Sequence, residues 1–425
     1  MNEDVLSFLW KFQYFERQNL QTETGENLQV LAVGQRNGDA GPDFMNARVL
    51  IDGLEWVGNV EIHVKTSDWQ RHAHTHDHAY DSVILHVVWE NDALINRPDG
   101  TLLPTFALKN RVQPHFLTKY YALIQSSAVI PCAAQFADVA DLSKISMLDR
   151  ALTQRLERKV VFVNELWARN QQDWEETAYQ LLAHNFGFKI NSEPFLQLAQ
   201  GLPFKILQKH RDNLTQLEAL LLGQAGWLEN SDVSDEYVET LRREYAFLAA
   251  KYDLKPQQMQ AHEWKMLRLR PANFPAVRLA QLAALVQAQP SLFSLFINVA
   301  NAADLIKTLQ IKQSNYWQKH YLIGKEATGK VATLGRSSAE NILINTVVSL
   351  LVAYSQAKDN RDWLDKALNL LENLPAEQNH ITDIWKDLGL PIKSSFDSQA
   401  AIELYNQFCT PKKCLQCNIG VALVR

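Results

Sequence analysis

Short runs in which apolar and polar residues alternate dominate the first part of the chain. β-Branched and aromatic residues are frequent in these runs, and Gly, Asn and Asp stand between them, as is typical of strands and their turns. Two segments with apolar residues at helical spacing, 4–15 and 112–124, flank the runs. Residues 1–130 are therefore predicted to form an α/β domain with a small mixed sheet. The predicted strands are 28–34, 46–52, 54–65, 83–90 and 102–108.

The period of the pattern becomes helical after residue 138. The stretch 141–170 is a long amphipathic segment, and similar segments continue to Phe408. We therefore predict an α+β protein in which a large all-α region, 139–425, follows the α/β domain. A chain of 425 residues is also too long for one compact core, which supports at least two domains.

Composition narrows the class of protein. The net charge of −5 provides no overall attraction to nucleic acid, so such binding would need a local basic patch. The acidic N-terminus is unlike a signal peptide, and the longest apolar run, 341–355, is short and interrupted by Asn and Ser, which argues against a membrane span. Four cysteines do not make a disulfide framework. The expected location is the cytoplasm.

Three polar residues share one face of the predicted strand 54–65. Side chains alternate across a strand, so Glu61, His63 and Lys65 point one way while the apolar residues between them point the other. Asp43 lies in the turn GDAGPDF before the preceding strand, and a hairpin would bring it close to Glu61. Two neighbouring carboxylates beside a lysine suit Mg²⁺ or Mn²⁺. The candidate catalytic residues are therefore Asp43, Glu61, His63 and Lys65, with Asp43 and Glu61 as metal ligands.

This pattern resembles the PD-(D/E)XK nuclease-like superfamily, whose core is a helix, a three-strand meander, a further helix and a strand. GPD at 41–43 is similar to the first half of the motif, and 61–65 is similar to the second. The resemblance implies a restriction-endonuclease-like domain in which Asp43 and Glu61 bind the metal and Lys65 is the catalytic lysine. Two features depart from the family: His63 holds the usual lysine position, and the connection 66–82 is short for a crossover helix.

Motifs along nearly the whole chain resemble a second family. This family consists of uncharacterised bacterial proteins grouped as a domain of unknown function (DUF2851-like), and the resemblance implies no activity. The motifs are GDAGPDF, GNVEIHVK, YDSVILHVVWEND, NFGFKINSEPF, LRLRPANFPAVRLAQLA and CLQC.

Six of the chain's twelve histidines lie between residues 63 and 86. In HAHTHDHAY every second residue from 72 to 78 is histidine, so an extended backbone would put these side chains on one side. His74 is the best candidate to reach the Asp43–Glu61 site as a further metal ligand, because imidazole with carboxylate suits Zn²⁺, Mn²⁺ or Fe²⁺. His86, between apolar residues of the next predicted strand, is interpreted as a core residue. The alternative for the whole run is a polar loop.

Cysteines supply the other chemical pattern. Cys409, Cys414 and Cys417 have C-x4-C-x2-C spacing, and the fourth cysteine is Cys132. A CxxC pair chelates thiophilic metals, so all four are candidate ligands of one tetrahedral site that ties the tail to the N-terminal domain. The cofactor would be zinc or an iron–sulfur cluster. A reduced, metal-free CxxC is the alternative.

Lys265, Arg268 and Arg270 are candidate contacts for nucleic-acid phosphates, with helix capping and ion pairing as the plainer roles. Phosphate-loop, dinucleotide-binding, GxSxG and HExxH motifs are absent, so no nucleotide cofactor is expected. The predicted function is that of a metal-dependent nuclease or phosphodiesterase acting on DNA or RNA. The alternative is a catalytically inactive nuclease-like scaffold, or a nucleic-acid- or protein-binding module, with a structural metal site.

Overall fold

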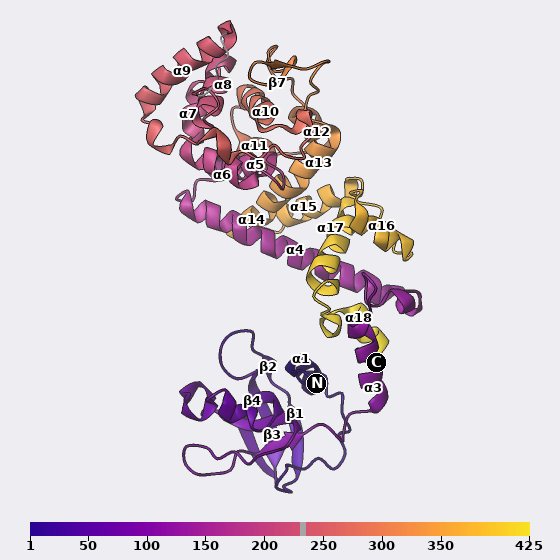
Figure 1. Cartoon of the computed structure of the whole chain (residues 1–425). Coiled ribbons are helices and arrows are strands. Elements are labelled where there is room, and N and C mark those ends of the chain that lie inside the picture. Colours follow the sequence, from indigo (N-terminus) through magenta and orange to yellow (C-terminus); the bar gives the residue numbers. More distant parts are fainter. Residues whose placement is uncertain (230–234) are drawn as a thin grey trace. The chain divides into compact units, whose positions relative to one another are not determined.

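The structure, a computed structural model that describes residues 1–229 and 235–425, divides into two compact units. The first unit contains Met1–Met147 and Leu404–Arg425, and the second contains Leu148–Glu403. The first unit holds a mixed sheet, whereas helices make up most of the second (Figure 1). The predicted α+β class, with a small mixed sheet ahead of a large helical region, is therefore confirmed.

The sheet of the first unit has the strand order β1-β3-β4-β5-β6, with β2 paired to β3. The pairs β1–β3 and β3–β4 are antiparallel, whereas β4–β5 and β5–β6 are parallel. Each of the five predicted runs contains a strand, and β2 is an addition to them. The strands are β1 (Leu28–Ala32), β2 (Gln35–Arg36), β3 (Phe44–Ile51), β4 (Leu54–Lys65), β5 (Val83–Glu90) and β6 (Thr105–Ala107).

Helices of the first unit precede, connect and follow these strands. The helix α1 contacts β4 and β5, and the short α2 contacts β4. The helix α4 (Asp141–Arg169) begins in the first unit and continues into the second. The remaining helical elements of the first unit are α1 (Glu3–Lys11), α2 (Asp68–Arg71), η1 (His74–His76), η2 (His78–Tyr80), α3 (Pro114–Gln125), η3 (Ala133–Asp138), η8 (Tyr405–Cys409), η9 (Cys414–Gln416) and α18 (Asn418–Val424).

A two-residue turn fixes the register of the β3–β4 hairpin. Asp52 and Gly53 have φ angles of 46° and 80°, and Ile51 pairs with Leu54 across them. An Asp-Gly pair with positive φ at both positions is the turn that best matches the twist of a hairpin. The register then shifts by one residue between Ala47 and Phe44, so Phe44 pairs with Val60 and Asp43 lies beside Glu61.

Residues 59–63 of β4 are buried on both faces of the strand. Val60 and Ile62 belong to the apolar core, as their alternation predicts, and Glu61 and His63 on the opposite face are also buried. The connection between β4 and β5, which contains α2, covers these polar residues; its Trp69 lies 6.5 Å from the ring of His63. The buried polar face is therefore enclosed rather than open to solvent along its length.

Gly58 allows β4 and β5 to approach each other closely. A Cβ atom at this position would lie 2.5 Å from Ile84 Cγ2 and 2.6 Å from the Ser82 carbonyl oxygen. We expect Gly58→Val to reduce the free energy of unfolding by about 1–3 kcal/mol, because overpacking forces strands or side chains to shift. Urea denaturation measures the effect, and Gly38→Ala, where no atom lies within 4 Å of the added Cβ, is the control. Equal stability of both variants would contradict the close approach.

The second unit is built around buried leucine- and alanine-rich helices, among them α8, α10 and α14. A short strand pair, β7 (His320–Leu322) and β8 (Lys325–Glu326), also belongs to it. Its helices are α5 (Trp174–Phe186), α6 (Ser192–Gly201), α7 (Phe204–Lys209), α8 (Leu214–Gln224), α9 (Glu236–Tyr252), η4 (Lys255–Gln257), η5 (Ala261–Glu263), η6 (Pro271–Asn273), α10 (Pro275–Ala288), α11 (Leu292–Ile297), α12 (Ala302–Leu309), α13 (Arg336–Ile342), η7 (Leu343–Val347), α14 (Val348–Lys358), α15 (Asp362–Asn373), α16 (His380–Asp387) and α17 (Ser395–Leu404), the last of which ends in the first unit.

Among the described helices, the continuous stretch Arg336–Lys358 is long and apolar enough to cross a membrane by length and composition. It contains the apolar run noted in the sequence. Since 67% of its apolar window is buried inside the protein, it has the burial of a core helix.

Candidate functional site

The two carboxylates predicted to be neighbours do lie together. The backbone N–H of Asp43 donates a hydrogen bond to Glu61 Oε2 at 3.1 Å, and the N–H of Ile62 donates to Asp43 Oδ2 at 3.1 Å. Arg36, on β2, is 3.2 Å from Asp43 Oδ1. The Asp43 carboxylate is thus held by the backbone of β4 and by a cation, whereas Glu61 directs its second oxygen, Oε1, toward the histidines.

A chain of imidazoles runs across the buried face of the sheet. His63 Nδ1 is 2.8 Å from His86 Nε2, and His63 Nε2 is 3.0 Å from His72 Nδ1. Parallel pairing of β4 with β5 places His86 opposite Glu61, next to His63. Both His63 and His86 are fully buried, so the two rings fix each other's orientation.

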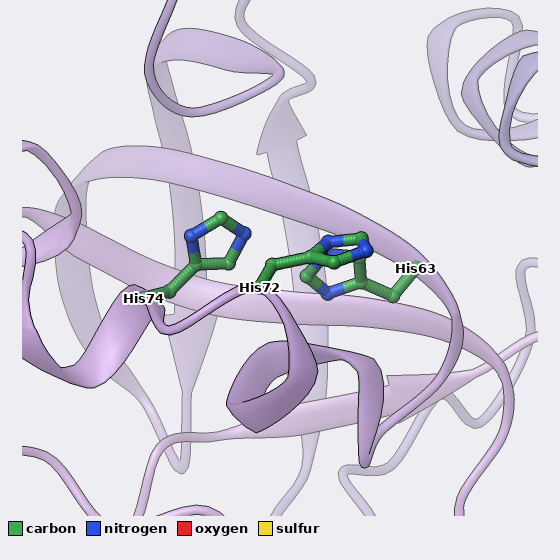
Figure 2. Close-up of side chains that lie close together, drawn as sticks. All are labelled: His63, His72 and His74. Carbon is green, nitrogen blue, oxygen red and sulfur yellow. The ribbon is translucent and has the colours of Figure 1, made fainter.

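One carboxylate adjoins a group of three imidazoles. Glu61 Oε1 lies 3.5 Å from His63 Nε2 and 3.4 Å from His74 Nε2. Ring nitrogens of His63, His72 and His74 all lie within 4.8 Å of one another, and the rings gather at one side of the sheet (Figure 2). Ligands at about 2.1 Å from a tetrahedral ion are separated by about 3.4 Å, so this donor set fits a bound divalent metal.

The ring nitrogen Nε2 of His74 is a further potential metal ligand. This nitrogen is buried and forms no hydrogen bond within the described part of the chain, although it faces Glu61. The ring is stacked on Tyr80 at 3.7 Å between centroids, so it is not free to turn toward water. Buried polar atoms are rarely left unsatisfied, and a metal ion would satisfy this one.

The connection between β4 and β5 brings its histidines back over the sheet. Asp68 Oδ2 accepts a hydrogen bond from Lys65 N at 3.0 Å, which starts α2 directly after the strand. Ala73 then adopts a left-handed conformation with φ of 60°, and the buried Trp69 donates to Thr75 Oγ1 at 3.2 Å. This compact fold, rather than an extended run, brings His72 to His63 and His74 to Glu61.

Burial sets the charge state of the site. Burial, and then the charge of Asp43, raises the pKa of Glu61 to about 8. Burial and the neighbouring His86 lower the pKa of His63 to about 2, and burial lowers the pKa of His86 to about 3. The imidazoles of His63 and His86 are therefore neutral, and the neutral form is the one that binds metals, whereas Glu61 must release a proton when it becomes a ligand.

In the metal-free protein, we expect the contribution of these groups to stability to be greatest near the ordinary histidine pKa of 6.5. Below pH 6.5 the two histidines bind protons in the unfolded chain, whereas the buried His63 and His86 of the folded chain do not. This difference lowers the free energy of unfolding by about 1.4 kcal/mol per pH unit for each residue. Glu61 acts in the opposite sense, since the fold keeps it protonated up to about pH 8 while the unfolded chain ionises it above 4.5. Stability should therefore also fall from pH 6.5 to 8.

Urea unfolding in EDTA across this pH range measures the profile. Glu61→Gln should remove the decrease on the alkaline side. It should also make the rise with pH steeper between 4.5 and 6.5, where Glu61 opposes the histidines. An identical alkaline decrease in this variant would assign it to other groups.

The other predicted residues belong to other segments of the two units. Lys65 is exposed at the end of β4, near Asp92, whose pKa is lowered by hydrogen bonds from Ser67 and, to a smaller extent, by the Lys65 charge. Lys265, Arg268 and Arg270 are exposed in the second unit, between η5 and η6. The four cysteines, Cys132, Cys409, Cys414 and Cys417, are all buried in the first unit, apart from the histidine group.

Three residues near the site were not chosen from sequence. The sequence favours His74 over His72 and predicts a core role for His86, although a polar residue inside the apolar run VILHVVW is a usable signal of a functional position. Glu3, in the first turn of α1, is the third. Burial and the charge of Asp43 raise its pKa, so it lies within electrostatic reach of the carboxylates.

A cavity of about 200 Å³ adjoins His74. Trp69 and Tyr80 contribute aromatic walls, and Arg97 contributes a cation. Arg97 is held in place by a hydrogen bond to the Val83 carbonyl at 3.0 Å. The cavity can therefore admit a small planar group next to the histidines.

Comparison with known proteins gives a family without an assigned activity. No curated protein and no solved structure matches the chain significantly. A sequence model of one family, described as a protein of unknown function (DUF2851), matches residues 3–380, which is most of the chain. The chain therefore belongs to this family of proteins of unknown function.

Proposed function

We propose that the first unit binds one divalent transition-metal ion through Glu61, His63, His72 and His74 and hydrolyses phosphodiester bonds in nucleic acid. The observation that carries this proposal is the convergence of these donors, with Glu61 Oε1 3.5 Å from His63 Nε2 and 3.4 Å from His74 Nε2. Such ions, when bound, polarise a phosphoryl oxygen and lower the pKa of water.

The donor set favours zinc, or Mn²⁺ or Fe²⁺, over magnesium. Imidazole nitrogen suits transition metals, whereas Mg²⁺ prefers oxygen ligands and keeps several waters. Asp43, expected from sequence to be a ligand, is occupied by Arg36 and by the Ile62 N–H. Its role in this proposal is to hold Glu61 through its own N–H and to raise the basicity of the Glu61 carboxylate.

His86 acts as a positioning residue. For His63 to offer Nε2 to a metal, its proton must be on Nδ1, and this proton is then donated to His86 Nε2 at 2.8 Å. The remaining proton of His86 is on Nδ1, a buried atom with no hydrogen-bond partner among the described residues. A partner of this kind, which fixes the tautomer of a ligand, is a regular feature of histidine metal sites.

The order of elements supports the phosphodiesterase assignment. A helix, the β1–β3–β4 meander, a helical connection and the parallel β5 follow one another as in the nuclease-like core, with Asp43 before one strand and Glu61 in the next. The aromatic walls of the cavity beside His74 suit stacking of a nucleobase. Under this proposal Lys265, Arg268 and Arg270 remain candidates for phosphate contacts of the second unit.

Wild-type protein, treated with EDTA and reloaded with zinc, manganese or magnesium, should be tested on labelled single- and double-stranded DNA and RNA. Zinc or manganese should restore cleavage better than magnesium, because the ligands are mostly imidazoles. Absence of cleavage by folded, metal-loaded protein on every substrate would contradict the hydrolase assignment.

We expect Lys65→Ala to retain most of this cleavage. The side chain is exposed at the strand end, and so the loss should be smaller than the roughly 10²-fold caused by removing a group that acts in proton transfer. A matched change at the neighbouring position of the same row, His63→Ala, should abolish cleavage. Loss of activity in Lys65→Ala would instead restore the lysine role implied by the nuclease resemblance.

A specific observation also favours the alternative, a catalytically inactive nuclease-like module. Arg36 already neutralises Asp43, and Lys65 is exposed. In that case the site would bind metal without cleavage, and nucleic-acid binding would persist in the cleavage assay as a shifted, intact substrate.

A further inference from the structure

The cysteines form a second cluster of metal-binding side chains, separate from the histidine group. Cys132, Cys409, Cys414 and Cys417 comprise every cysteine of the chain, and all four are buried in the first unit. Three come from the C-terminal segment and one from the loop between α3 and α4.

The C-terminal segment folds into two consecutive turns, each beginning at a cysteine. Lys412 N donates to Cys409 O at 3.0 Å, and Cys417 N donates to Cys414 O at 3.2 Å. Gly420 packs against the second turn so closely that a Cβ would lie 2.3 Å from the Cys414 carbonyl oxygen. The turns therefore hold three thiols within one short, tightly packed segment.

Contacts on both sides of Cys132 bring the segment to it. Ile124 and Ser126, which precede Cys132 in the chain, accept hydrogen bonds at their carbonyl oxygens from Lys412 Nζ, at 2.7 and 3.0 Å. Ser146, which follows Cys132, accepts a hydrogen bond at Oγ from Asn418 Nδ2, at 3.0 Å. The fourth cysteine thus lies between two anchor points of the segment that carries the other three.

The four thiols also affect one another's pKa. Burial, followed by Cys417 and Cys414, raises the pKa of Cys132 to about 12. Burial and Cys417 raise the pKa of Cys414 to about 11, and burial with the three other thiols raises that of Cys409 still further. Because each of Cys132, Cys409 and Cys414 is influenced by the charge of at least one other thiol, the four cysteines lie near one another in the first unit.

We propose that Cys132, Cys409, Cys414 and Cys417 bind one Zn²⁺ in a closed tetrahedral site that clamps the C-terminal segment to the first unit. Binding converts four thiols into four thiolates and releases four protons to solvent. Four protein sulfurs leave no open position, so the site is structural, and CxxC spacing is typical of such zinc sites. Closing the long loop from Cys132 to Cys409 also restricts the unfolded chain.

The experiment replaces zinc with Co²⁺ in the whole protein and records its absorption spectrum. Thiolate ligands give intense sulfur-to-cobalt charge-transfer bands in the near ultraviolet, which imidazole and carboxylate ligands do not. Wild type should show these bands, and so should a His74→Gln variant of the other site. This control keeps failure of the cysteine proposal distinct from failure of the histidine proposal.

Cys132→Ser and Cys417→Ser should each lower the zinc content by one equivalent per chain and weaken or abolish the bands. Leu415→Ala, which removes a buried side chain between two of the cysteines but no thiol, should keep both zinc and bands. If a cysteine variant does not fold, the wild-type spectrum alone still decides. Wild type without sulfur-to-cobalt bands, or protein purified with iron and sulfide in place of zinc, would overturn the proposal.

Discussion

Glu61→Gln is expected to reduce the zinc affinity of the histidine site by more than the roughly 10–100-fold that loss of an outer partner causes, and to abolish metal-dependent cleavage. Glutamine keeps the size of the side chain but removes the charged oxygen that lies 3.5 Å from His63 Nε2 and 3.4 Å from His74 Nε2. Three neutral imidazoles alone then face the ion. Competition with a chromogenic chelator measures the affinity.

Glu55→Gln is the matched control. Glu55 lies on the same strand, but it is exposed and paired with Arg48 at 2.6 Å. Its exchange should leave zinc affinity and cleavage unchanged. Equal zinc affinity of Glu61→Gln and wild type would remove Glu61 from the ligand set.

The second large effect concerns the helical unit. Glu403→Ala is expected to lower the free energy of unfolding by about 3–5 kcal/mol, the range found when one partner of a buried ion pair is removed. Glu403 is 2% exposed and 3.2 Å from Arg155 Nη1, and it also pairs with Arg158. Burial lowers the pKa of the Arg155 guanidinium, so its charge is already costly and would lose its main compensation.

Chemical denaturation followed by circular dichroism measures this change. Glu229→Ala breaks an exposed pair with Lys255 in the same unit and should cost at most about 1 kcal/mol. Similar losses in the two variants would show that burial of the Glu403 cluster does not determine its energy.

The local sequence pattern was sufficient to predict most strands of the first unit. Alternation predicted the strands, and Asp52-Gly53 is a strong hairpin signal. Given the hairpin, the general proximity of Asp43 and Glu61 followed, because register decides which residues of neighbouring strands meet, although the register shift between Phe44 and Ala47 sets the exact pairing. Strand and hairpin geometry depend on short-range sequence, so one chain was enough to predict them.

The histidine geometry could not be predicted in the same way. His72 reaches His63 and His74 reaches Glu61 because the connection folds into a short helix and a left-handed Ala73, rather than an extended run. His86 meets His63 through the register of a parallel pair, which depends on that connection. Arg36 meets Asp43 only because β2 adds to β3. Each of these contacts depends on tertiary packing.

The most direct test of the proposed metal centre is X-ray diffraction at the zinc absorption edge from crystals of the zinc-loaded protein. We predict an anomalous peak at about 2.0–2.2 Å from ring nitrogens of His63, His72 and His74 and from a carboxylate oxygen of Glu61. A peak at the cysteines in the same crystal would demonstrate that zinc is available to the protein. Clear density for the four histidine-site side chains without a peak between them, at full zinc occupancy elsewhere, would contradict the proposal.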